Sequence, residues 1–290
     1  MRKIILLFSI CMVAIFTAAS CSSDYEDISD YDGTKQVSFI CSGDFSIESV
    51  TEMTRAINTN VSDIWVFDYM DGKFVQEIHQ KTGDMDFGRP TLNLKYGKHT
   101  LYFVISDGDC PTVDNANFII KWDKPGDTFH SSMTINVTSN SNNNFTVDMN
   151  RIVAKLAVRI NDGLPLNANT FEMIASKWFN SINYITADAV NQKQFTYSLE
   201  IPSIYKGNTN SIEYDFYTLL NGNSFTTNPY INVYGENGKI IGTASLGNVE
   251  MVRGKLCTYT GSFAFTDGSD GIAQISFNLP EWGHGTNGTW

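Results

Sequence analysis

The sequence is poor in positive charge. Its 290 residues include 20 Lys and Arg against 31 Asp and Glu, which gives a formal net charge of −11 at pH 7. Affinity for nucleic acid depends on Lys and Arg side chains that neutralise phosphates. The acidic balance therefore argues against a phosphate-binding surface, and nucleic acid is not an expected partner.

Residues that carry common catalytic chemistry are also scarce. The four histidines form neither a metalloprotease pattern nor a paired-ligand pattern, and they are His79, His99, His130 and His284. The sequence has no Gly-x-Ser-x-Gly elbow and no phosphate-binding glycine loop. We therefore expect no catalytic residue, no metal site and no cofactor. Paired carboxylates for glycoside cleavage stay open, because such groups meet in space rather than in sequence.

Cysteine occurs at five positions. Cys11 and Cys21 lie at the N-terminus, which leaves Cys41, Cys110 and Cys257 for the rest of the chain. Three thiols allow one disulfide at most, and an arrangement with none is equally open. No Cys-x-x-Cys pair or Cys/His cluster indicates zinc.

Long apolar runs are absent after the N-terminus. There, two basic residues at 2–3 precede an apolar segment at 4–16 and the small residues of Ala18-Ala-Ser-Cys21. A charged start, a short apolar core and small residues are typical of a secretory signal, and the run is short for a membrane span. A cysteine directly after the small residues resembles a bacterial lipoprotein signal, in which Cys21 becomes the lipidated N-terminus.

The alternative is plain secretion with cleavage near Ala19. Residues 21–35 are acidic and contain few core-forming side chains, so we expect a flexible tether. Serine and acidic residues just after the cysteine also resemble the surface-export signal of some Gram-negative lipoproteins.

Aromatic and β-branched residues are plentiful, and they occur in short segments separated by Ser, Thr, Asn and Gly. This pattern is typical of all-β sandwiches. Residues 64–69 are apolar on both faces and precede Asp71-Gly72, which predicts a central strand followed by a hairpin turn. Segment 169–180 predicts a short helix or an irregular strand. Further strands are expected at 36–40, 73–79, 92–94, 101–105, 118–122, 133–137, 195–201, 214–220, 231–233, 239–243, 256–265 and 272–279.

The apolar pattern changes phase within residues 145–160. Apolar side chains occupy odd positions up to Met149 and even positions from Ile152 onward. Because successive side chains of a strand point to opposite faces, the buried face changes at Asn150-Arg151. A β-bulge would explain the change. We favour a chain that leaves one sheet and enters another, because strand-like segments lie on both sides in roughly equal amounts.

Taken in order, several features resemble the fimbrillin family, the lipoprotein pilins and accessory subunits of type V fimbriae. They are the signal ending at Cys21, the strand at 37–40, Thr54-Arg55-Ala56 before the strand at residue 64, Asp71-Gly72-Lys73, and the segment 145–156. The resemblance covers most of the chain. It implies an all-β fold of two tandem β-sandwich domains of the transthyretin-like type, with limits 1–20 for the signal, 21–35 for the tether, 36–149 for the N-terminal domain and 150–290 for the C-terminal domain.

The resemblance also implies a mechanism. In fimbrillins the lipid carries the precursor to the outer membrane, and an arginine-specific protease then cuts after an arginine in the N-terminal domain. Loss of the first strand opens a groove that a strand from a neighbouring subunit fills. The matching arginine is Arg55, which is otherwise an ordinary loop arginine, and the excised strand would include Val37, Phe39 and Ile40.

The partners implied are other fimbrial subunits through donor-strand exchange, the outer membrane through the lipid on Cys21, and a host receptor or glycan. Anchor-type members of the family keep their lipid and first strand. Segment 272–290 is either a donor strand or an edge strand of the core with a tail.

The second hypothesis for the function is a surface glycan-binding lipoprotein of a polysaccharide-uptake system with exposed aromatic residues as its platform. Trp282 and Trp290 would serve sugar stacking or a core role.

Overall fold

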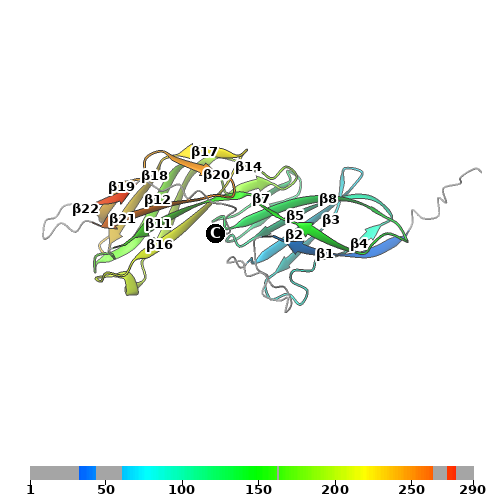
Figure 1. Ribbon diagram of the computed structural model, residues 1–290, viewed down its shortest axis with the longest axis horizontal. Coiled ribbons are helices and arrows are strands. Elements are labelled where there is room, and N and C mark those ends of the chain that lie inside the picture. Colours follow the sequence, from blue (N-terminus) through cyan, green and yellow to red (C-terminus); the bar gives the residue numbers. More distant parts are fainter. Residues whose placement is uncertain (1–32, 44–60, 162, 264–272, 279–290) are drawn as a thin grey trace, which may run out of the picture.

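The computed structural model describes residues 33–43, 61–161, 163–263 and 273–278. Their regular structure consists of strands and one short 3-10 helix, η2, at Ser203–Tyr205, so the prediction of an all-β chain is confirmed. The molecule is elongated, with the N-terminal half (the described residues up to 151) and the C-terminal half (those from 153 to 278) at opposite ends (Figure 1). Among these residues no helix is long and apolar enough to cross a membrane. Cys21 and Arg55 lie outside the described residues.

Two sheets pack face to face in the N-terminal half. The smaller consists of β4 (Thr91–Lys95), β1 (Thr34–Ser42) and β9 (Asn144–Asp148), in that order. The larger consists of β10 (Asn150–Arg151), β8 (Thr128–Val137), β5 (Gly97–Ser106), β2 (Asp63–Met70) and β3 (Lys73–Lys81), in that order. Alternate side chains from both sheets meet in one buried apolar core, which is the arrangement of a β-sandwich.

A single sheet folded on itself forms most of the C-terminal half. Its strands, in sheet order, are β15 (Lys193–Glu200), β12 (Ala168–Trp178), β18 (Pro229–Gly235), β19 (Ile240–Ser245), β22 (Ala273–Asn278), β21 (Leu256–Phe263), β11 (Val153–Ile160) and β16 (Ile212–Leu219). Strands from its two ends meet through the core, because Phe216 of β16 lies 5.0 Å from Tyr197 of β15 and 6.2 Å from Phe171 of β12 between ring centroids. Strands β17 (Ser224–Thr227) and β20 (Val249–Val252) form a separate pair.

The mid-chain segment changes sheets as predicted. β9 pairs with β1, the two-residue strand β10 pairs with β8, and β11 pairs with β16 and β21. Met149 and Ile152, on either side of the change of phase, are both buried. The chain therefore passes through three sheets between residues 144 and 160.

The helix expected as one alternative for residues 169–180 is wrong, because the segment forms strand β12. The register with β15 shifts between Ala175 and Trp178. This irregularity returns Trp178 to the buried face, which strict alternation from Phe171 would not do. The near-helical spacing therefore combines Phe171 and Trp178, which the β-bulge brings to one buried face, with Ile174 on the other face. An edge strand was one alternative for residues 272–290. That alternative is wrong for residues 273–278, because β22 lies between β19 and β21 inside its sheet.

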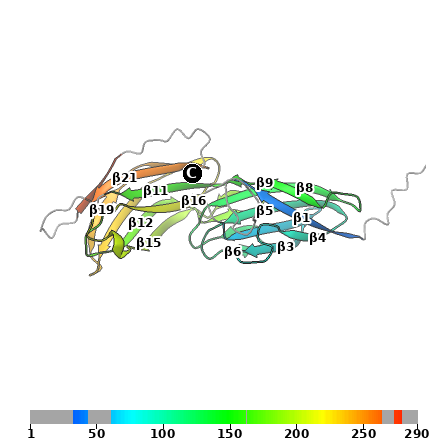
Figure 2. The same ribbon diagram turned by 60° about the horizontal axis from the view of Figure 1, so that its bottom comes forward.

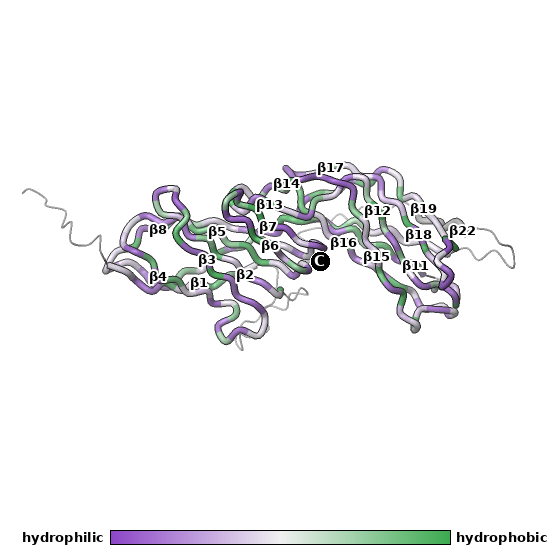
Figure 3. Tube along the Cα trace, turned by 180° about the vertical axis from the view of Figure 1, so that it is seen from behind, coloured by the Kyte–Doolittle hydropathy of each residue, from purple (hydrophilic) through white to green (hydrophobic). Residues whose placement is uncertain are grey.

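The two halves share a third core and a short sheet. The sheet consists of β14 (Asp188–Val190), β13 (Ser181–Asn183), β7 (Ile119–Lys121) and β6 (Thr112–Asp114), in that order. Its central pair joins the halves, since Ile182 of β13 lies opposite Ile120 of β7 and both are fully buried. Figure 3 shows β13, β7 and β6 side by side between the two halves.

Aromatic side chains from β2 fill this joint. Phe67 stacks on Tyr184 with ring centroids 3.8 Å apart, and Trp65 meets Trp122 edge-on at 6.3 Å. The Tyr69 and Tyr184 hydroxyls lie 2.9 Å apart within hydrogen-bonding distance. The odd-numbered residues of β2 thus face the C-terminal half while the even-numbered residues Ile64 and Val66 face the N-terminal core.

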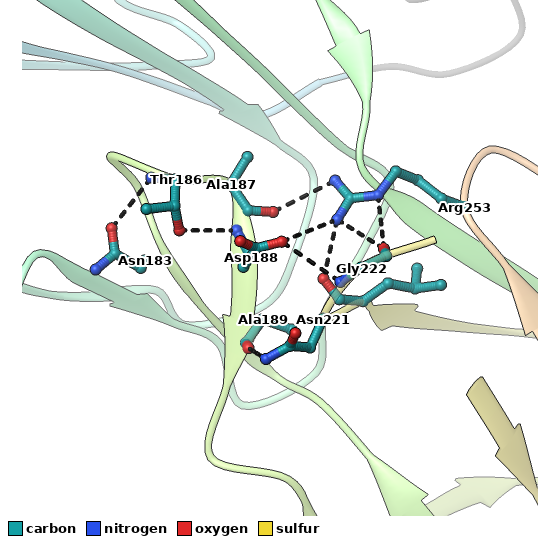
Figure 4. Close-up of polar contacts among 9 residues, drawn as sticks. Asn183, Thr186, Ala187, Asp188, Ala189, Asn221, Gly222 and Arg253 are labelled. Atoms are coloured by element: carbon teal, nitrogen blue, oxygen red, sulfur yellow. Dashed lines mark hydrogen bonds and ion pairs between the residues drawn. The ribbon is translucent and has the colours of Figure 1, made fainter. Parts of the chain in front are cut away.

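Arg253 fastens the β13–β14 hairpin to the C-terminal half (Figure 4). Its guanidinium donates hydrogen bonds to the carbonyl oxygens of Ala187 at 3.3 Å, Leu220 at 3.1 Å and Gly222 at 3.0 Å, and it lies 3.6 Å from Asp188 Oδ1. The Arg253 side chain therefore joins the turn at Ala187-Asp188 to the loop between β16 and β17.

We predict that Phe67→Ala lowers the free energy of unfolding by about 3–5 kcal/mol, because it leaves a cavity beneath Tyr184. Chemical denaturation followed by tryptophan fluorescence measures the loss. Phe74→Ala is the matched control, since Phe74 lies on the neighbouring strand with 42% of its surface exposed, and it should cost less than about 1 kcal/mol. Equal losses in the free energy of unfolding for the two variants would contradict a stabilising role for the packing of Phe67 on Tyr184.

Candidate functional site

Strand β1 occupies the centre of its sheet. It pairs antiparallel with β4, with Val37 opposite Leu92, and parallel with β9, with Phe39 opposite Phe145. Figure 2 shows β1 and β9 side by side in the N-terminal half. Withdrawal of β1 would leave one vacant strand position between β4 and β9, with unpaired main-chain groups on both sides. Such a position can accept an extended chain by β-augmentation.

The side chains of β1 divide between two faces. Val37 and Phe39 are fully buried in the N-terminal core and Cys41 is 4% exposed, whereas Ile40 is half-buried on the opposite face. The Phe39 ring lies 5.3 Å from the Phe103 ring and 5.8 Å from the Phe145 ring between centroids. Of the three residues predicted to belong to an exchanged strand, Val37 and Phe39 therefore fill core pockets and Ile40 does not.

Main-chain bonds tie β1 to both neighbours. On one side, the amide of Phe39 donates to the Pro90 carbonyl at 3.0 Å; on the other, the amide of Ser38 donates to the Asn143 carbonyl at 2.8 Å. Side chains add to both sides, because the Ser38 hydroxyl lies 2.9 Å from the Thr91 hydroxyl and the Ser42 hydroxyl donates to Asp148 at 2.8 Å. An incoming strand without proline at these positions could reproduce the main-chain bonds.

Strand β4, one wall of this position, is also held by the facing sheet. His99 Nε2 lies 2.8 Å from the Lys95 carbonyl oxygen, and Gln76 Nε2 donates to the Asn93 carbonyl oxygen at 3.1 Å. Both carbonyls belong to β4, whereas His99 and Gln76 lie on β5 and β3. Asp68 of β2 organises the two donors, with Oδ1 2.7 Å from His99 Nδ1 and Oδ2 3.1 Å from Gln76 Nε2.

The geometry around His99 favours a positively charged ring. Both ring nitrogens face acceptor oxygens, and only the imidazolium donates from both. Complete burial opposes this charge and lowers the pKa of His99, but the hydrogen bond and negative charge of Asp68 and the Lys95 carbonyl outweigh it, so the pKa is raised overall. Neither side chain of the His99–Asp68 pair has exposed surface. The wall formed by β4 is therefore anchored by a buried ion pair.

We predict that His99→Gln destabilises the protein by roughly 3–5 kcal/mol near pH 6, because it leaves the Asp68 carboxylate buried without its cation. The folded-state pKa of His99 lies above its unfolded value near 6.5. The stabilisation is thus fully present below pH 6.5 and is lost as the pH rises through the raised pKa.

Urea denaturation of wild type and variant between pH 5 and 9 tests this prediction. The difference between their free energies of unfolding should shrink as the pH rises. A difference that stays constant or grows would show that His99 is neutral in the folded protein. The His79–Asp63 pair is present in both proteins and cancels from the difference.

The carboxyl group of Asp107 is buried, with a raised pKa. Burial, and secondarily the negative charge of Asp127, raises its pKa to about 7. Its Oδ1 is buried without a hydrogen-bond partner among the described residues, and a Cβ atom at position 126 would lie 2.0 Å from it, so glycine is required there. Asp127 itself binds Arg151 through two bonds of 2.8 and 2.9 Å.

Burial of the Asp107 carboxyl group affects the stability of the protein. The described residues contain no set of three or more His, Cys, Asp or Glu side chains able to hold a metal ion. We predict that Asp107→Asn stabilises the protein at pH 8 by about 1–3 kcal/mol, because it removes a buried carboxylate.

The folded-state pKa of Asp107 is raised, so wild-type stability falls as the pH rises from about 4 to about 7. The advantage of Asp107→Asn should accordingly disappear near pH 4. Thermal melts of both proteins at pH 4 and pH 8 measure it, and an advantage that is equal at both values would rule out this origin.

The thiols of the described residues are free. Cys41 and Cys257 are buried, which raises the pKa of Cys41 to about 12 and that of Cys257 to about 11, whereas Cys110 is exposed. No disulfide joins these three residues. Because Cys41 lies on β1, its accessibility reports whether β1 occupies its position.

Sequence reasoning identified β1 but missed the residues that hold its neighbour. Neither the buried contacts of His99 nor any role of Gln76 was predicted from the sequence. The available signal was Asp68, a carboxylate inside the apolar segment 64–69. A charge buried in a strand with two apolar faces requires a partner.

Comparison with known proteins supports the fold. The profile of a family of unknown function, DUF6562, matches residues 110–286, a range that begins just before β6. A candidate adhesin from Bacteroides ovatus superimposes with a TM-score of 0.51 at 14% identity, covering 87% of this chain and 96% of that one. A candidate cell adhesion protein from Bacteroides fragilis gives 0.50 at 11% identity, covering 86% and 98%.

The fimbrial anchor protein Mfa2 from Porphyromonas gingivalis gives a TM-score of 0.43 at 11% identity, covering 85% of this chain and 98% of that one. This likeness is too low to carry an argument about function. Comparison with curated proteins finds no match. At these identities the matched structures show a shared fold and nothing more specific.

Proposed function

The chain belongs to the family of unknown function DUF6562, and we propose that it is a structural or accessory subunit of fimbriae attached to the outer membrane, supporting cell adhesion rather than catalysing a reaction. The observation that carries this proposal is the position of β1. An N-terminal strand lies between two strands that come from later parts of the chain, and one of these is anchored independently by the facing sheet.

The order of the sequence couples membrane attachment to this strand. Cys21, the proposed lipid site, and β1 both precede Arg55, while β2 begins at Asp63. A cut after Arg55 therefore separates the lipid and β1 together from the rest of the chain. The cut subunit would be free to leave the membrane and would keep β1 by noncovalent contacts alone. An uncut subunit would remain an anchor.

An incoming strand must replace what β1 supplies. It needs apolar side chains at the alternate positions of Val37, Phe39 and Cys41, and it takes main-chain bonds from β4 and β9. Burial of one such Val or Phe side chain contributes about 1.5–3 kcal/mol. An empty position is therefore unfavourable, so β1 should leave as another strand enters. The proposed partner is a second fimbrial subunit that donates this strand.

A thiol-labelling experiment tests strand replacement directly. In the mature chain without Cys21 and with Cys110→Ser, Cys41 and Cys257 are the remaining thiols, and both are buried. We predict that a maleimide reagent labels neither in the intact protein. After treatment with an arginine-specific protease, Cys41 should become reactive while Cys257 stays protected, and multimers should form.

Arg55→Gln is the control and should keep Cys41 protected under the same treatment. Mass analysis distinguishes a cut at Arg55 from one at Arg89, which is an exposed arginine of the described residues. A complete cut at Arg55 that leaves monomers with a protected Cys41 would overturn strand exchange as the means of assembly.

A further inference from the structure

The outer face of β12, β18 and β19 presents three rows of side chains that the register of the sheet aligns. The middle row crosses four strands, because Glu172 lies opposite Ser198 and Asn232, and Asn232 lies opposite Thr243. The row on one side contains Tyr230 opposite Ile174 and Ser245, and the row on the other contains Tyr234 opposite Thr170. The face thus carries a polar row between two tyrosines of one strand.

Hydrogen bonds connect the tyrosines to the polar row. The Tyr234 hydroxyl donates to Glu172 Oε1 at 2.9 Å, and Asn232 Nδ2 donates to the same oxygen at 3.1 Å. The Thr243 hydroxyl lies 3.2 Å from Asn232 Oδ1 and is also bonded to the Tyr230 hydroxyl. A continuous chain of side chains therefore runs from one tyrosine to the other across three strands.

This network fixes the orientation of both rings. Tyr230 and Tyr234 lie on opposite sides of the middle row, yet both hydroxyls return to it. Each side chain therefore leans along the sheet toward the middle row instead of standing upright. Tyr230 has 41% of its surface exposed, and Tyr234 is partly exposed. Four residues of strand separate the two positions by about 13 Å.

The chemistry of the rows selects the class of ligand. Flat aromatic faces match the apolar C–H face of a sugar ring, and their negative quadrupole attracts the polarised hydrogens. Among the described residues none donates a hydrogen bond to Glu172 Oε2, which can accept one from a sugar hydroxyl. The rows contain the carboxylates of Glu172 and Glu200 and no Lys or Arg, so an acidic polymer would be repelled.

We propose that this face binds a neutral saccharide chain, with sugar rings stacked on Tyr230 and Tyr234 and the intervening hydroxyls bonded to the Glu172 row. The site lies in the C-terminal half and uses no residue of β1 or its neighbours. It therefore does not depend on strand exchange, and it would give a fimbrial subunit or any other surface protein its own adhesive contact.

Affinity gel electrophoresis of the full mature chain tests this proposal. The probes are three neutral polysaccharides, starch, xyloglucan and galactomannan, and one acidic polysaccharide, polygalacturonate. At least one neutral polysaccharide should retard the protein while polygalacturonate does not. Tyr230→Ala and Tyr234→Ala should each weaken the binding of that polysaccharide at least tenfold.

Tyr230→Phe keeps the ring and should retain more binding than Tyr230→Ala, an outcome that a loss of folding would not give. Phe74→Ala removes an exposed aromatic residue from the other half and should leave binding unchanged. Near-ultraviolet circular dichroism verifies that each variant is folded. Retardation by none of the neutral polysaccharides, retardation by polygalacturonate alone, or wild-type binding by both tyrosine-to-alanine variants would overturn the proposal.

Discussion

The structure depends on the burial of both faces of β2. Its odd-numbered residues form the aromatic joint with the C-terminal half, and its even-numbered residues Ile64 and Val66 enter the N-terminal core. Asp68, on the second face, binds His99 and Gln76, which in turn hold β4. One strand therefore links the two halves of the molecule, the packing of the first sandwich and the wall beside β1. A substitution on either face of β2 would disturb the aromatic joint, the N-terminal core and the contacts that hold β4, because a buried strand cannot shift without disturbing both of its surfaces.

Strong local patterns in the sequence predicted much of the fold. The two-sided apolar run at 64–69 predicted β2, and Asp71-Gly72 predicted its hairpin, where both residues have positive φ. The change of phase near Asn150 predicted the change of sheet. The sequence did not predict β6, β13 and β14, because strands of three residues carry no periodicity and exist here through pairing across the joint. The parallel pairing of β1 with β9 also lacks a local signal, since the two strands are about a hundred residues apart.

The candidate site divides in the same way. Alternation in β1 identified Val37 and Phe39, whose burial follows from strand geometry, but it could not separate them from Ile40 without knowing which sheet face is covered. The network around His99 depends on contacts among β2, β3, β4 and β5, so no spacing within the sequence encodes it. The proposed saccharide-binding face of β12, β18 and β19 also has no signal in sequence spacing, because its rows arise from the register of four strands. Position in a sheet, rather than sequence motif, creates each of these sites.

The proposed replacement of β1 would place two opposing demands on the sheet that receives the new strand. The vacant position must keep its shape when one strand leaves, yet it must hold the strand through bonds that any successor can form. The division of contacts meets both demands. Main-chain bonds and apolar pockets hold β1, and an incoming strand with the right alternation can supply both. The ion pair and amide that hold β4 come from the facing sheet and make no use of β1. Had β4 depended on β1 alone, loss of β1 would have released one wall together with the strand, and no groove would remain for a successor.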